Sequence, residues 1–224
     1  MSLTTTDAIS SAAPLAPPPA NGATPRSRFD LSCVVGTMTV DEWDAFVRKA
    51  KHKHDYVHGW VVRRADCSPA HNLLASNFAF TVGNALEKVG NPCEVLGSDQ
   101  RVFVKRGLYY FPDLVVFCGE ALVDNRDAIQ NPVALVEVLS PTTRDDDRGE
   151  KLQEYAQIET LRHYILIDQD TVAVTHYEKM NADTLTLTHE YRALSDVLTL
   201  TFGGKTVAVP LSRIYRNVPV VETA

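Results

Sequence analysis

The sequence lacks an apolar run long enough to cross a membrane, and it lacks an excess of positive charge. A spanning helix needs roughly 18 to 20 apolar residues, and no run here approaches that length. Lysine and arginine total 22 against 28 acidic residues, for a net charge of −6. Because nonspecific nucleic-acid affinity comes largely from basic side chains, this balance argues against a protein that coats nucleic acid. It does not exclude an enzyme that acts on it, and we expect a soluble body with no membrane partner.

Cysteine is scarce, and its spacing forms no recognisable motif. The chain has 4 cysteines, and Cys33, Cys67, Cys93 and Cys118 form no C-x-x-C pair or metal-finger pattern. We therefore predict reduced thiols in a cytoplasmic protein, with Cys118 as a small core residue.

Large apolar side chains are rare near the N-terminus, where Ala, Pro, Ser and Thr dominate (SSAAPLAPPPANGATP). Such a composition does not offset the entropy of ordering. We expect a flexible tail over 1–35, a single domain over 36–218 and a short tail over 219–224. The start of the chain lacks the basic segment and apolar core of a secretory signal.

The body alternates helical and strand-like segments. Thr39 and Glu42 have the spacing of a capping box, which predicts a helix that ends near 49–51. A tight hairpin is expected around Gly59, and Ser68 followed by Pro69 predicts a helix to about residue 89. Strands are then expected at 94–96, 100–105, 114–118, 133–139, 163–168, 172–176 and 185–187, with a final strand and a short helix near the C-terminus.

Three histidines lie close together near the hairpin. His52, His54 and His58 are spaced by two and four residues in a lysine-rich segment. This spacing does not define one coordinating face. A solvated polar turn is therefore a better interpretation of these histidines than a metal site.

Two acids lie in or beside apolar strands. Asp113 follows Pro112 and opens the run 114–118, and Glu137 lies inside the run 133–139. A buried carboxylate needs a cation or strong donors to stay ionised. Carboxylates on neighbouring strands with a nearby lysine can hold a divalent metal against a phosphate.

The lysine has to come from the following segment. Side chains alternate along a strand, and the position two residues after Glu137, on its own face, is Leu139. Residues 147–155 have helical character, with 147, 151 and 155 on one face. Lys151 would then reach back to orient and help deprotonate water or to stabilise phosphate charge. The main-chain carbonyl of Val138 would complete the metal ligands.

Each residue also has an ordinary interpretation. Asp113 is then a strand-start residue, Glu137 forms a buried ion pair with Arg101 or Lys151, and Lys151 is a surface lysine. Asp55 can point inward as a further acid. His71, in the first turn of the helix after Pro69, is better explained as a surface or capping histidine. For the ordinary interpretation to hold, three features must all be accidental: an acid at a strand start, an acid inside a second apolar strand and a cation on the next helix. Together they therefore favour a site more than any one of them does.

Several segments resemble one family. They are MTVDEW, HDYVHGW, SPAHNLL, GSDQRV, YYFPDLVV, LVEVLSPTT and KLQEY to HYILID. The sequence resembles the Uma-type restriction-endonuclease family, a branch of the PD-(D/E)xK nuclease superfamily, over residues 38–217.

The resemblance implies an α/β (α+β) restriction-endonuclease-like core, a central mixed β-sheet flanked by helices, with C-terminal antiparallel strands. It implies that Asp113 and Glu137 are the metal-binding pair and that Lys151 is the relocated lysine. Asp55 matches the early acid of the family, and His71 matches the histidine after its Ser-Pro.

The chain departs from the family pattern at three positions. It has Asp55 where the family has Glu, His58 where Asp is usual and Trp60 where Glu is frequent. The outer acidic part of the site is therefore altered.

We predict an endonuclease that uses Mg²⁺ or Mn²⁺ to hydrolyse phosphodiester bonds of DNA, acting as a homodimer. The alternative is a binding or regulatory module that keeps the nuclease fold without turnover. A third hypothesis is a hydrolase of a different phosphate ester.

Overall fold

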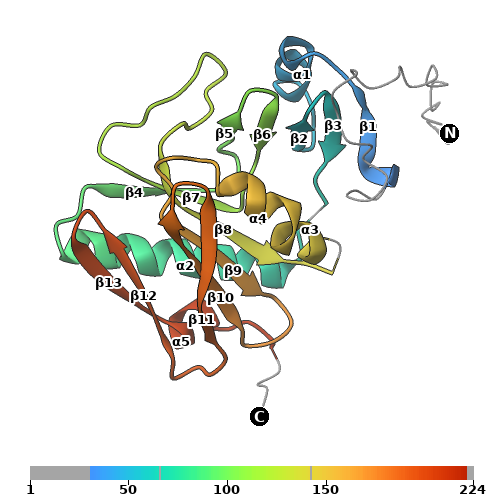
Figure 1. The fold of residues 1–224 in the computed structure, drawn as a ribbon. Coiled ribbons are helices and arrows are strands. Elements are labelled where there is room, and N and C mark those ends of the chain that lie inside the picture. The colour runs from blue at the N-terminus through green and yellow to red at the C-terminus, as the bar shows by residue number, and fades with distance from the viewer. Residues whose placement is uncertain (1–30, 66, 142, 221–224) are drawn as a thin grey trace, which may run out of the picture.

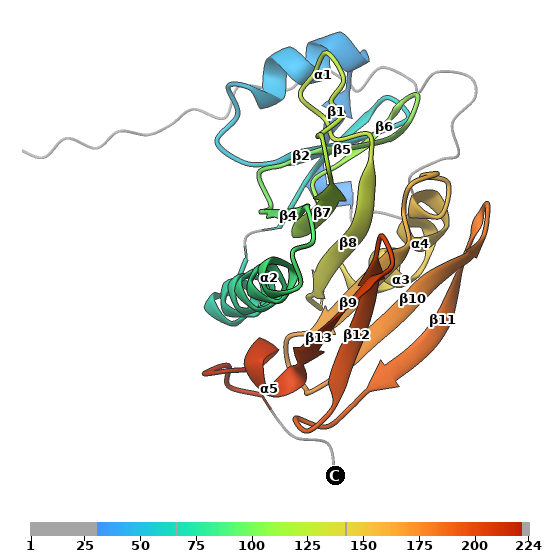
Figure 2. The same ribbon diagram turned by 90° about the vertical axis from the view of Figure 1, so that its left-hand side faces the viewer.

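A six-stranded mixed sheet lies at the centre of the molecule (Figures 1 and 2). The structure is a computed structural model that describes residues 31–220 except Asp66 and Thr142. The strand order is β11-β10-β9-β8-β7-β4, in which only β8 and β9 are parallel neighbours. The strands are β4 (Cys93–Leu96), β7 (Leu114–Cys118), β8 (Pro132–Leu139), β9 (His163–Asp168), β10 (Val174–Asn181) and β11 (Thr184–Tyr191).

Helix α2 (Pro69–Lys88) covers one face of this sheet (Figure 2). The Ser68 side chain accepts from the His71 N–H and Pro69 lies in the first turn, so the predicted start is confirmed. Its apolar face packs with β8 and with a second layer that closes this core. That layer consists of β12 (Val197–Phe202), β13 (Lys205–Pro210) and α5 (Leu211–Ile214).

The crossover from β8 to β9 covers the other face. It contains two short helices, α3 (Arg144–Arg148) and α4 (Glu150–Tyr155), rather than one continuous helix. The break falls at Gly149, where an added Cβ would lie 2.8 Å from the Asp145 carbonyl oxygen. Asp147, Lys151 and Tyr155 are all buried, so the expected common face survives the break.

A five-stranded antiparallel sheet packs beyond one end of the central sheet (Figure 1). The predicted hairpin turns at His58 and Gly59, both with positive φ. Trp43, on α1 (Val40–Val47), packs against aromatic rings of this sheet, and the capping box between Thr39 and Glu42 is present. The strands are β1 (Val34–Thr37), β2 (His54–Val57), β3 (Trp60–Arg63), β5 (Val102–Lys105) and β6 (Leu108–Tyr110).

Regular structure begins earlier than expected. The 3-10 turn η2 (Leu31–Cys33) and strand β1 lie partly inside the predicted tail, because Val34 pairs with Val62 of β3. The rest of that tail, and residues 221–224, lie outside the described residues.

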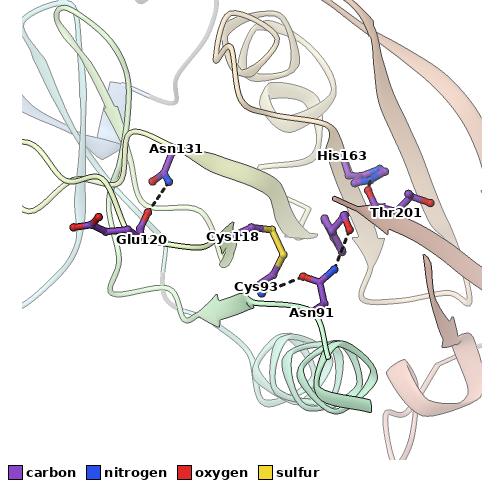
Figure 3. The surroundings of a disulfide bond; sticks show 8 residues. Asn91, Cys93, Cys118, Glu120, Asn131, His163 and Thr201 are labelled. Carbon is purple, nitrogen blue, oxygen red and sulfur yellow. Dashed lines mark hydrogen bonds between the residues drawn. A yellow bond between two sulfur atoms is a disulfide. The ribbon is translucent and has the colours of Figure 1, made fainter. Parts of the chain in front are cut away.

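The prediction of four reduced thiols is wrong for two of them. Cys93 and Cys118 form a disulfide between β4 and β7 (Figure 3). The two residues are direct partners in the antiparallel register, which brings their side chains together. Cys33 and Cys67 are free. The expectation of a cytoplasmic location, which relied on reduced thiols, loses that support.

Within 31–65, 67–141 and 143–220, no helix has both the length and the apolar character needed to cross a membrane.

Candidate functional site

The two strand acids lie side by side. Leu114 pairs with Val136 in the antiparallel register of β7 and β8, so the preceding Asp113 lies opposite Glu137. Their residues are only 3% and 1% exposed, respectively. Burial of this kind requires compensating donors and cations, and the structure supplies several.

Asp113 is held in its charged form. Its Oδ2 accepts the Val138 N–H at 2.8 Å and lies 3.0 Å from His71 Nε2. Burial raises the pKa of Asp113, but the hydrogen bond from His71 and the charge of Arg64 outweigh it and lower the pKa to about 2. The same contact, working against burial, raises the pKa of His71 to about 10, so His71 is a cation and a donor at neutral pH. The favoured interpretation of His71 as a surface or capping histidine is therefore wrong, because its ring is buried and contacts Asp113.

Glu137 is less firmly charged. Its Oε1 lies 2.7 Å from Lys151 Nζ and accepts the Tyr155 hydroxyl at 3.0 Å. Burial raises the pKa of Glu137 to about 7, against the opposing charges of Lys151 and Arg64. A further cation placed beside a carboxyl group with a pKa near 7 would lower that pKa and favour the charged form.

Lys151 points into the site and not to solvent. It is 3% exposed, and its amine also lies 3.0 Å from Asp147 Oδ1. The Tyr164 hydroxyl donates to the main-chain carbonyl of Asp147 and thereby holds α3 against β9. Burial lowers the pKa of Lys151, but the negative charges of Asp147 and Glu137 raise it by more, so the net shift is upward. The amine is thus a fixed cation, which suits charge stabilisation and not proton abstraction.

Arg64 belongs to this charged cluster, and the sequence reasoning missed it. It follows β3, and its Nη2 lies 3.2 Å from Asp113 Oδ1 and 3.5 Å from Glu137 Oε2. The Arg63-Arg64 pair after the hairpin is only a weak sequence signal, because it does not show which arginine turns toward the acids. The suggested partner Arg101 was wrong, because Arg101 binds Asp44 at 2.6 Å and lies over the Trp43 ring.

Asp55 lies at the edge of this cluster. Its Oδ1 accepts the Phe111 N–H at 2.8 Å, and its Oδ2 lies 3.8 Å from Arg64 Nη1. Burial raises the pKa of Asp55 above its ordinary value. Asp55 therefore ties β2 to the segment that leads into Asp113 and adds a carboxyl to the site.

A cavity of about 370 Å³ lies beside the two acids, and it is lined by side chains that contact them rather than by Asp113 and Glu137 themselves. Its lining includes Arg64, Cys67, His71, Val138, Asp147 and Lys151. A larger hollow lies between α2 and β13, away from the buried acids. The smaller cavity is the one with convergent charged groups, and it is the candidate site.

The donor set fits a divalent metal. Asp113 Oδ1 and Glu137 Oε2 both contact the same Arg64 nitrogen, so the two oxygens face one point. Carboxylate oxygens are the ligands that Mg²⁺ and Mn²⁺ prefer. An ion at that point requires the guanidinium to move aside.

Two groups of three side chains among the described residues have ligand atoms close enough to hold a metal ion. One is Cys67, His71 and Asp113, of which Cys67 and His71 line the same cavity, and the other is His163, His176 and Glu178. The hairpin histidines belong to neither group. His54 is buried, and His58 occupies the turn.

Comparison with known proteins agrees with this fold. A family profile, Uma2, described as "Putative restriction endonuclease", matches residues 40–209. Two uncharacterized proteins of Synechocystis sp., slr1290 and sll1609, are 31% and 30% identical over 138 and 135 residues. These matches cover 61% and 59% of this chain and 72% and 75% of the relatives.

A solved structure shares the fold. It is titled as a putative nuclease belonging to DUF820 from Anabaena variabilis, and it superimposes with a TM-score of 0.62 at 15% identity. The match covers 80% of this chain and 97% of that chain. The predicted mixed sheet flanked by helices is therefore confirmed as the fold of a nuclease-like neighbour. On the extent of the profile match, the chain belongs to the Uma2 family, described as "Putative restriction endonuclease".

Proposed function

We propose that this protein is an endonuclease that hydrolyses phosphodiester bonds of DNA with Mg²⁺ or Mn²⁺. One observation carries the proposal: Asp113 Oδ1 and Glu137 Oε2 face a single point beside the buried cation Lys151. Family and fold support a nuclease. The dependence on a divalent metal and the choice of DNA as substrate go beyond what family and fold support, and they are part of this proposal.

Asp113 and Glu137 would hold the metal through these two oxygens, with the Val138 carbonyl as a third protein ligand. When bound, Mg²⁺ polarises a phosphate and lowers the pKa of a nearby water. His71 and the Val138 N–H fix the Asp113 carboxylate, and Tyr155 fixes that of Glu137. These bonds would hold both carboxylates toward the ion once the Arg64 guanidinium has moved aside.

Lys151 would stabilise the negative charge that develops on the phosphate. Its amine stays protonated because Asp147 and Glu137 flank it. A charged donor already in position is worth most in a site shielded from water. Proton removal from the attacking water then belongs to the solvent or to the substrate and not to Lys151.

The direct test is cleavage of plasmid and oligonucleotide DNA in Mg²⁺ or Mn²⁺. Glu137→Gln and Asp113→Asn keep the shape of each side chain and should abolish cleavage. Glu94→Gln, an exposed acid on β4, is the matched control and should cleave like the wild type. Equal rates for wild type and Glu137→Gln would refute the proposal.

A binding module without turnover is the second candidate. It is favoured by Arg64, whose guanidinium already bridges Asp113 and Glu137 and neutralises them without a metal. Calorimetry separates the two functions. A nuclease should bind Mn²⁺ in a manner that Asp113→Asn abolishes, whereas a module of this kind should show no such binding.

We further propose a homodimer, because two copies with one site each can cut both strands of a duplex. Sedimentation at micromolar concentration should give twice the mass of a 24.8 kDa chain. A monomeric mass would contradict this part of the proposal.

A further inference from the structure

A second cluster of ligating side chains lies on the opposite face of the central sheet from Glu137. His163 begins β9, and His176 and Glu178 lie on β10. Glu178 is the cross-strand partner of His163, and His176 lies two residues earlier on the same face. This face carries Ile165 and Val174 into the core beneath α2 and β12, whereas Leu135 and Leu139, which share the face of Glu137, pack into another core.

The three ligand atoms are close enough to share one ion. They lie within 4.8 Å of one another, with His163 Nδ1 at 3.0 Å from His176 Nε2 and 3.6 Å from Glu178 Oε1. A tetrahedral zinc ion with bonds of about 2.0–2.1 Å separates its ligand atoms by roughly 3.3–3.4 Å. The two measured separations lie on either side of that value, so small side-chain shifts suffice.

His163 is oriented as metal-binding histidines usually are. Its Nε2 lies 3.0 Å from the Thr201 main-chain carbonyl, as Figure 3 shows. A carbonyl only accepts, so Nε2 carries the hydrogen and the Nδ1 lone pair faces His176 and Glu178. Proteins commonly fix a ligating imidazole through such a bond from its second nitrogen. The edge-on contact with Phe202, at 5.2 Å between ring centroids, holds the ring in place.

Both rings are suited to binding a cation in their neutral form. His163 and His176 are 3% and 2% exposed, and burial lowers the pKa of each. The Glu178 side chain is 37% exposed, which leaves an entry path on its side. In the ordinary interpretation His176 donates a hydrogen bond to His163, and Glu178 has no role in the contact.

We propose that His163 Nδ1, His176 Nε2 and Glu178 Oε1 form a binding site for a zinc-class divalent cation, with the fourth position open to solvent. Two imidazoles and one carboxylate select zinc-like ions over Mg²⁺, which prefers oxygen ligands. The site joins β9 to β10 beneath β12. It is separate from the Asp113 and Glu137 site, and it does not depend on the proposed nuclease activity.

The test uses the full chain carrying Asp113→Asn and Glu137→Gln, which removes the other proposed metal site. The protein is stripped with a chelator and dialysed against Zn²⁺, and bound metal is measured by elemental analysis. Co²⁺ titration followed by visible absorption reports tetrahedral coordination independently. We expect about one equivalent of Zn²⁺ and a tetrahedral Co²⁺ spectrum.

Glu178→Gln is the decisive variant, because its partly exposed side chain can be changed without disturbing the core. It should weaken Zn²⁺ binding by roughly tenfold or more. Glu190→Gln, an exposed acid on the neighbouring strand β11, is the matched control and should bind like its parent. His176→Gln should abolish binding, with its fold checked by circular dichroism. Absence of bound Zn²⁺, or equal affinity with and without Glu178→Gln, would overturn the proposal.

Discussion

At the scale of single residues, the site contains two cations on one carboxylate, the buried Lys151 and the partly buried Arg64, and we expect them to act differently. Lys151 contacts Glu137 Oε1 from α4, whereas Arg64 contacts Oε2 from the loop after β3. Only Arg64 also contacts Asp113, at the point where two carboxylate oxygens converge. Lys151 can therefore remain in place beside a metal, while Arg64 has to leave.

Lys151→Met should lower the rate of DNA cleavage by about 10²–10³-fold, because a positioned charge at the phosphate is lost. Metal binding should persist, since the oxygens that face Arg64 are untouched. Initial rates on a labelled oligonucleotide, together with Mn²⁺ calorimetry, test both statements. A Lys151→Met protein that is folded and cleaves at the wild-type rate would remove the lysine from the mechanism.

Arg64→Met, unlike Lys151→Met, should change the affinity of the site for metal. In the metal-free protein it leaves two buried carboxylates without their shared partner, which costs roughly 3–5 kcal/mol of unfolding free energy. Because the competing guanidinium is gone, Mn²⁺ should bind more tightly and raise the melting temperature more than in the wild type. An equal Mn²⁺-induced shift in both proteins would show that Arg64 does not compete with the ion.

The contrast between these residues shows what a sequence can reveal about a site. Glu137 stood out because an acid inside an apolar strand is costly, and the turn-by-turn spacing of a helix indicated how Lys151 could reach it. Arg64 carries no comparable signal, since an arginine after a hairpin usually lies in solvent. Its role depends on how β3 docks beside β7 and β8, and that docking is a long-range property.

At the scale of secondary structure elements, the break between α3 and α4 positions Lys151. Gly149→Ala would place a Cβ 2.8 Å from the Asp145 carbonyl oxygen, so the two helices have to move apart. We expect a loss of about 1–3 kcal/mol in unfolding free energy and slower cleavage. Gly83→Ala, inside α2 with no atom within 4 Å of its added Cβ, should stabilise by about 0.5–1 kcal/mol. Denaturant titration of both variants tests the opposite signs, and two changes of the same sign would contradict this account.

The edge of the central sheet supplies a covalent prediction. Cys93 and Cys118 face each other across β4 and β7, which no spacing rule in the sequence indicated because the pairing depends on strand register. The unfolded chain, prepared without reductant, should show two reactive thiols, from Cys33 and Cys67. After reduction it should show 4. Four reactive thiols before reduction would show that the purified protein lacks the disulfide.

At the scale of the whole molecule, a net charge of −6 works against binding to DNA. Periodicity and capping predicted most of the helices and strands, and the family resemblance implied how they are arranged in a mixed sheet flanked by helices. The charge of the assembled site was not predicted. Four acids, Asp55, Asp113, Glu137 and Asp147, face three cations, Arg64, Lys151 and His71.

A phosphate entering this site therefore meets an excess of negative charge unless a metal is present. We expect Mg²⁺ to tighten the binding of a short DNA duplex by about tenfold or more, or roughly 1.4 kcal/mol. Fluorescence anisotropy with the slow variant Lys151→Met measures the affinity without rapid cleavage. Adding Asp113→Asn should abolish the effect of Mg²⁺, and because it removes one negative charge from the site, it should not weaken the metal-free affinity. If Mg²⁺ tightens binding equally in both proteins, it acts on the DNA or elsewhere on the surface, and the duplex does not bind through the Asp113 and Glu137 site.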